Sequence, residues 1–150
     1  MNWLVPLLAL LLVVPGCSTQ VQLSGAPVGI GPEWTEVKTS TAIEGRYERK
    51  TLVVVLESGT GMPTPNELRD RPHVVKLAGG KDVVVRAEAV TDKGTVPLQR
   101  DGDACPGYDG QCALMFSGQL PRHFLLTAVR VKSSEPVVVQ RLLWLEGAPK

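Results

Sequence analysis

Aromatic residues are scarce in this chain of 150 residues, since Phe, Trp and Tyr together make up 5% of it. A hydrophobic core must therefore be built mainly from Val and Leu. An excess of either charge is also missing: 16 basic residues face 15 acidic ones, and the formal net charge is +1. Basic and acidic residues are interspersed, which argues against a one-sided patch for nucleic acid. Length and composition predict one globular domain that does not bind nucleic acid.

The motifs of the common catalytic sites are absent as well. The sequence has no Gly-x-Ser-x-Gly elbow, no Walker loop, no dinucleotide fingerprint and no paired-histidine zinc helix. Its two histidines, His73 and His123, are far apart in the sequence, and we expect both at the surface or at strand ends. The sequence therefore predicts a protein that is not an enzyme and has no cofactor.

The longest apolar run extends from Trp3 to Val14 at the N-terminus. Its length of about 12 residues is short of the roughly 20 that cross a bilayer, and it fits the apolar region of a signal peptide. The run ends in Val14-Pro15-Gly16-Cys17. This segment resembles the lipobox of bacterial lipoproteins, in which a small residue precedes an obligatory cysteine.

The resemblance implies that a signal peptide of residues 1–16 is removed and that Cys17 becomes the acylated first residue. Its thiol would carry diacylglycerol and its amine a fatty acid such as palmitate. Several acyl chains, at about 0.8 kcal/mol per buried methylene, make such an anchor effectively permanent. Ser18 follows the cysteine. In enteric-type lipoproteins a residue other than Asp at this place favours the outer membrane. The expected location is therefore the bacterial cell envelope, lipid-anchored and facing the periplasm.

Two cysteines, Cys105 and Cys112, are left over if Cys17 carries lipid, and the expected compartment is oxidising. The loop between them contains two glycines and a proline, so it can close on itself. A bridge would contribute about 2–3 kcal/mol. The spacing fits neither a redox pair nor a zinc knuckle. We predict a structural disulfide.

Residues 17–32 comprise the acylated cysteine and a segment rich in Ser, Gly, Pro, Thr and Gln. This composition predicts a flexible tether in front of a folded domain of residues 33–150. A short edge strand at Val21-Gln22-Leu23 is the alternative for the first part of the tether.

Strand patterns dominate the remaining chain. We predict strands at residues 47–56, 73–77, 82–89, 96–98, 113–116, 125–132 and 137–145, with turns at 92–94 and 133–136. The continuous apolar run Leu52 to Leu56 is typical of a strand covered on both faces. Two strands alternate instead, and we expect these inward-facing sets: Val83, Val85, Ala87 and Ala89 in one, and Leu125, Thr127, Val129 and Val131 in the other.

About eight short strands separated by Gly and Pro turns predict an all-β fold, an antiparallel β-sandwich of jelly-roll or immunoglobulin-like topology. At most one short helix is expected, near residues 65–71. The segment 124–144, an alternating strand, a polar turn and a Val-rich strand ending in Trp144, resembles the closing strands of galactose-binding-like jelly rolls. The resemblance implies a fold and not a sugar-binding activity.

A cluster of acidic residues precedes and enters the loop between the two cysteines: Asp101, Asp103 and Asp109. Carboxylates on a turn are weakly similar to a calcium loop, because hard cations bind several oxygen ligands. Cys105 stands where such a loop needs its third ligand. We therefore predict a solvated turn without metal and keep calcium as the alternative.

Two aromatic residues, Trp34 beside the tether and Tyr108 in the cysteine loop, are expected to be exposed, and exposed aromatics are good anchors for a partner. The leading hypothesis is a non-enzymatic envelope lipoprotein that binds or scaffolds a protein or another envelope component. The alternative is a carbohydrate-binding module on the same anchor. A small periplasmic hydrolase with a spatially assembled carboxylate pair is the third hypothesis.

Overall fold

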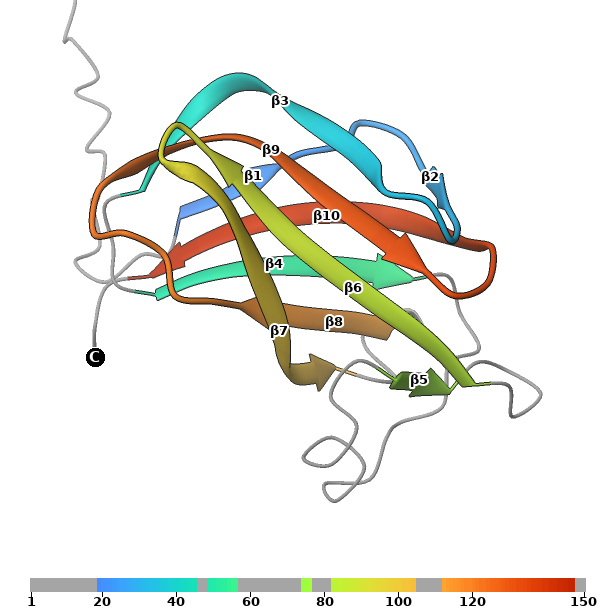
Figure 1. The fold of residues 1–150 in the computed structure, drawn as a ribbon. Coiled ribbons are helices and arrows are strands. Elements are labelled where there is room, and N and C mark those ends of the chain that lie inside the picture. The colour runs from blue at the N-terminus through green and yellow to red at the C-terminus, as the bar shows by residue number, and fades with distance from the viewer. Residues whose placement is uncertain (1–18, 46–48, 57–73, 77–81, 105–111, 148–150) are drawn as a thin grey trace, which may run out of the picture.

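The structure, a computed structural model, describes residues 19–45, 49–56, 74–76, 82–104 and 112–147. This part of the chain forms ten strands and no helix, which confirms the all-β prediction (Figure 1). It contains no helix of the length and hydropathy needed to span a membrane. The strands are β1 (Thr19–Gln22), β2 (Val28–Ile30), β3 (Thr35–Gly45), β4 (Arg49–Leu56), β5 (Val74–Lys76), β6 (Asp82–Thr91), β7 (Gly94–Ala104), β8 (Cys112–Ser117), β9 (Phe124–Ser133) and β10 (Val137–Gly147).

The strands build one antiparallel sheet that curls over on itself into two facing layers. Its order is β1-β10-β4-β8-β7-β6-β9-β3, with β2 beside β10 and β5 beside β6. β7 joins the layers, because its first half pairs with β6 and its second half with β8. Figure 1 shows β3, β9 and β6 crossing over the layer of β10, β4 and β8. The predicted antiparallel β-sandwich is confirmed.

The long strands pair in a nested manner: β1 with β10, β3 with β9, β4 with β8, and β6 with β7. A long two-stranded ribbon that wraps around a core in this way is a jelly roll. Of the two topologies that the sequence left open, the pairing therefore selects the jelly roll.

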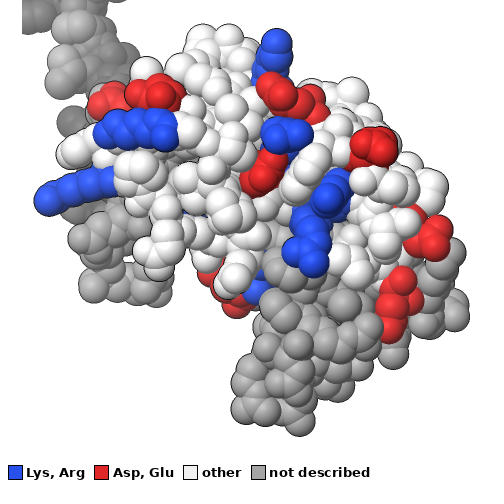
Figure 2. Space-filling view, in the orientation of Figure 1, with Lys and Arg blue, Asp and Glu red and all other residues white. Residues whose placement is uncertain are grey.

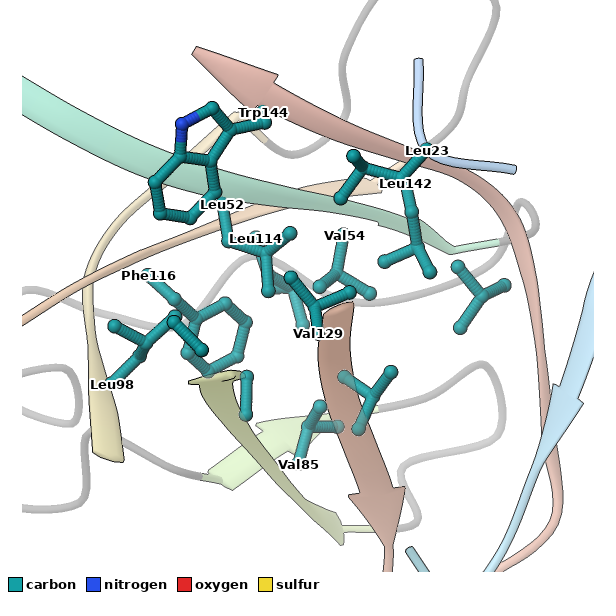
Figure 3. Packing of buried hydrophobic residues seen from close by; sticks show 14 of the residues in the cluster. Leu23, Leu52, Val54, Val85, Leu98, Leu114, Phe116, Val129, Leu142 and Trp144 are labelled. Carbon is teal, nitrogen blue, oxygen red and sulfur yellow. The ribbon is translucent and has the colours of Figure 1, made fainter. Parts of the chain in front are cut away.

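The core lies between the two layers and consists mainly of aliphatic side chains (Figure 3). Its largest fully buried members include Trp144, Phe116 and Leu114. β4 is covered on both faces, as its apolar run predicts: Leu52, Val54 and Leu56 face the core, whereas Val53 and Val55 pack with Leu143 on the other side of the sheet.

The alternation predicted for β6 is confirmed, since Val83, Val85, Ala87 and Ala89 are all buried and the residues between them are not. The predicted hairpin follows. The hydroxyl of Thr91 donates to the carbonyl of Gly94 at 2.8 Å and accepts the Lys93 N–H at 3.1 Å. Gly94 has a φ of 120°, which side chains other than glycine rarely adopt.

The prediction of a flexible tether up to residue 32 is wrong for the part of that segment that the structure describes. β1 and β2 both pair with β10, so residues 19–30 belong to the sandwich. The cause is burial: Leu23 and Ile30 join the core, and Val21 and Val28 pack against it. The folded domain therefore includes the described residues from Thr19 on, as the edge-strand alternative implied.

The inward set predicted for the strand after residue 124 is wrong in its first half. Leu125 and Thr127 are exposed, whereas Phe124 and Leu126 are buried. Relative to β6, Thr127 is an extra residue in β9, because the consecutive residues Val90 and Thr91 pair with Ala128 and Leu126. Such a bulge reverses the faces of the residues before it. The inward set is correct beyond the bulge.

The strand β3 is absent from the sequence-based prediction. It has only two partly buried aliphatic residues, Val37 and Ile43, separated by a stretch rich in Thr and Ser, and its register shifts between Lys38 and Ile43. An edge strand of this kind shows no clear period of two. The helix predicted near residues 65–71 lies outside the described residues.

Candidate functional site

Trp34 precedes β3 and is partly exposed. Two cations lie over its ring: Nζ of Lys132 at 4.6 Å from the ring centroid and Cζ of Arg130 at 5.2 Å. Both come from β9, because Thr35 pairs with Val131 and the following antiparallel register brings Trp34 beside Lys132. Cations over an indole face are attracted by its quadrupole, so the ring is held by about 0.5–1 kcal/mol per contact.

β6 adds two further charged side chains to this cluster. Nη1 of Arg130 bonds to Oε1 of Glu88 at 2.6 Å, and Arg86 lies opposite Lys132 on the same outer face. We call the set of Trp34, Arg86, Glu88, Arg130 and Lys132 the Trp34 surface. Figure 2 shows the face of the molecule that carries β3, β9 and β6, with basic and acidic side chains interspersed as the sequence predicts.

The Trp34 surface combines hydrogen-bond donors with a flat aromatic ring. It offers guanidinium and ammonium donors beside a flat apolar ring, and its one carboxylate is already paired with Arg130. Arg86, Arg130 and Lys132 occupy alternate positions on the paired strands β6 and β9. The backbone pairing therefore fixes where these donors start before a ligand binds. The arrangement suits a ligand that presents an anionic or hydroxyl-rich group next to an apolar face.

The opposite end of the sandwich closes with a buried polar group. Lys50 and Glu146, which pair across β4 and β10, are 9% and 4% exposed. Nε1–H of Trp144 donates to Oε1 of Glu146 at 3.3 Å, and Nζ of Lys50 lies 5.0 Å from the ring centroid of Phe124. Lys50 also donates to the carbonyl of Pro121 at 3.5 Å. These groups are enclosed by the fold, so their role is structural.

Sequence reasoning missed the partners of Trp34, although it placed their strands correctly. The predicted alternation leaves Arg86 and Glu88 on the outer face of one strand, and Arg130 and Lys132 on the outer face of another. Which outer residues meet depends on the order and register of the strands, and no local pattern encodes these. Arg100, buried opposite Phe116 with its side chain toward the core, was also not foreseen.

The predicted disulfide falls partly outside the described residues, because Cys105, like Tyr108 between the cysteines, is not among them. Cys112 is the first residue of β8. Ala104, the residue before Cys105, pairs with Ala113, the residue after Cys112. The bridge itself stays a prediction.

The calcium alternative also stays a prediction. Asp101 is exposed, and its carboxylate accepts a hydrogen bond from the Ser117 hydroxyl. The side chain of Asp103 and all of Asp109 lie outside the described residues. Among the side chains that the structure does place, no group of three potential metal-ligating residues occurs. His123 is exposed.

Comparison with known proteins adds no relative to this picture. No family model, no curated protein and no solved structure matches the chain. The case for a function therefore rests on the residues and the geometry described above.

Proposed function

We propose that this chain is a non-enzymatic lipoprotein of the bacterial envelope. Acyl chains on Cys17 hold it at the membrane, and its jelly roll binds a protein or another envelope component through the Trp34 surface. The observation that carries the binding role is Trp34 itself, a partly exposed indole whose ring is contacted by two cations of β9, Arg130 and Lys132.

The two ends of the sandwich support this division of roles. At one end, which we call the Thr19 end, Thr19 pairs with Glu146, Glu146 pairs with Lys50, and Lys50 lies over the Phe124 ring. Trp34 lies at the other end, because β3 starts there and runs to Gly45, opposite Phe124. A chain anchored at Cys17 therefore turns the Trp34 surface away from the bilayer.

Crosslinking in native membranes tests the proposal. We expect wild-type protein to capture a defined partner, and the Trp34→Ala and Lys132→Ala variants to lose it. Val138→Ala is the control, because Val138 is equally a surface residue at the same end, with 41% of its area exposed, but belongs to β10 in the other layer. Capture that is unchanged in Trp34→Ala would contradict the proposed binding surface.

One observation favours the carbohydrate-binding alternative. An aromatic ring flanked by side-chain donors is a common way to bind a sugar, since the ring stacks on the C–H face and the donors reach the hydroxyls. Titration with isolated peptidoglycan fragments and acidic glycans separates the two. Saturable glycan binding that is lost in Trp34→Ala would support a sugar ligand. If no glycan binds, the result would favour a protein partner.

A further inference from the structure

The Thr19 end exposes an apolar side chain in a fixed position. Leu125 is 41% exposed, and its backbone is held by Asp92 in the hairpin between β6 and β7. The Leu125 N–H donates to Oδ1 of Asp92 at 2.8 Å, and the Asp92 N–H donates to the carbonyl of Leu125 at 3.0 Å. The bulge at Thr127 turns this leucine outward. Its exposure therefore follows from the geometry of the backbone.

Cations border Leu125. Lys93 follows Asp92 in the same hairpin, and Arg122 precedes Leu125 by three residues; both are exposed. Two acidic residues described at this end have partners: Asp92 accepts the Leu125 N–H, and Glu44, which pairs with Leu125 across β3 and β9, has an interaction of its own. Lys93 and Arg122 are thus the exposed cationic donors that we assign to this end.

Acylation of Cys17 would place a bilayer at this end of the sandwich. Thr19 starts β1 at the Thr19 end, and only Ser18 separates it from Cys17. Consecutive Cα atoms are 3.8 Å apart, so the Cα atom of an acylated Cys17 would lie within about 8 Å of that of Thr19. Two residues are too few to hold the Thr19 end far from a bilayer that receives acyl chains on Cys17.

We infer that the end of the sandwich that carries Lys93, Arg122 and Leu125 rests on the lipid headgroups, with the Leu125 side chain among them. The occupant of this surface is the bilayer that receives the acyl chains. Lys93 and Arg122 donate to lipid phosphates, and Leu125 enters the boundary between headgroups and acyl chains. This inference rests on the acylation of Cys17 proposed above, and it adds an orientation to that anchor.

Fluorescence quenching tests the orientation in the full-length protein, isolated from bacterial membranes and reconstituted into vesicles of phosphatidylethanolamine and phosphatidylglycerol with brominated acyl chains. The variants are Leu125→Trp and the matched Val138→Trp, since both residues are 41% exposed and they lie at opposite ends. Wild-type protein supplies the background of Trp34 and Trp144. We expect the added fluorescence of Leu125→Trp to fall roughly twofold, because the side chain lies near the acyl boundary. That of Val138→Trp should not change.

Amine labelling of the unaltered side chains provides a measurement that does not depend on the folding of Leu125→Trp. In vesicle-bound wild-type protein, labelling of Lys93 should be several times slower than in a soluble form that starts at Ser18 and lacks residues 1–17. Labelling of Lys132, on the Trp34 surface, should be the same in both. Slower labelling at both lysines would contradict an oriented contact.

Mass spectrometry of the same sample separates the two proposals. If Cys17 is acylated and residue 125 is quenched no more than residue 138, the orientation is overturned and the lipoprotein stands. If Cys17 carries no lipid, both fall. Protection of Lys93 in native membranes but not in pure lipid vesicles would assign this end to a protein and overturn the lipid contact.

Discussion

The Thr19 end and the Trp34 end of the sandwich distribute polarity in opposite ways. At the Thr19 end two charged residues that lie opposite each other, Lys50 and Glu146, are buried, and an aliphatic side chain, Leu125, is exposed. At the Trp34 end an indole and two cations lie on the outer face. The first arrangement suits contact with lipid, and the second suits an approaching ligand in water. One jelly roll can therefore be anchored at one end and bind at the other.

The largest effect is expected from the buried polar group of the Thr19 end. Glu146→Ala removes the acceptor of the Trp144 indole and leaves the Lys50 charge buried without its cross-strand carboxylate. A buried N–H left without its acceptor costs about 1–3 kcal/mol, and the buried Lys50 ammonium, which loses the carboxylate opposite it, adds to that cost. Urea unfolding measures it, with Glu36→Ala on the exposed face of β3 as the control. Equal stability of the two variants would show that Glu146 is not part of a buried group.

At the Trp34 end we expect stability to depend on the predicted disulfide between Cys105 and Cys112. Cys112→Ser breaks the predicted bridge to Cys105 and is expected to lower the free energy of unfolding by about 2–3 kcal/mol. The same loss should follow when a reducing agent is added to the wild type. If the reductant leaves the urea midpoint of the wild type unchanged, the two cysteines are not paired.

Substitution of one glycine at each end, Gly45 and Gly29, tests how tightly the two ends of the sandwich are packed. An added Cβ at Gly45 would lie 2.4 Å from Cε1 of Phe124, whereas at Gly29 it would have nothing within 4 Å. We expect Gly45→Ala to destabilise by about 1–3 kcal/mol through overpacking. Gly29→Ala should be neutral or slightly stabilising. Thermal unfolding measures both variants. Equal unfolding midpoints for Gly45→Ala and Gly29→Ala would mean that the Phe124 side chain can move aside without loss of stability.

The smallest stability effect is expected at the Trp34 surface. Glu88→Gln removes the charge that pairs with Arg130, and a partly exposed ion pair is worth about 0–1 kcal/mol. The same change frees the Arg130 guanidinium for an anionic ligand, so partner capture should be kept or strengthened. A large loss of stability in this variant would mean that the surface is built for the fold and not for binding.

Local patterns in the sequence predicted much of the fold. The strict alternation of β6 and the continuous apolar run of β4 were both read correctly, because burial on one face or on two leaves a direct signature. The bulge in β9 was not foreseen. A bulge is set by the partner strands, so Leu125 was expected inside and is exposed.

The site was predictable only in part, for the same reason. Trp34 was expected to be exposed because it follows a Gly- and Pro-rich segment, and it is partly so. Its contacts with Arg130 and Lys132 depend on the pairing of β3 with β9, which joins residues nearly 100 positions apart. The length of the tether was misjudged because β10 offers free edge positions to β1 and β2, and composition does not reveal an available edge.

The most direct test is the mass of the N-terminal peptide of the mature protein, isolated from bacterial membranes. We predict that the peptide begins at Cys17 and carries diacylglycerol on the thiol and a fatty acyl chain on the amine. A peptide that begins upstream of Cys17, or one that carries a free thiol at that residue, would contradict the anchor on which the orientation of both ends depends.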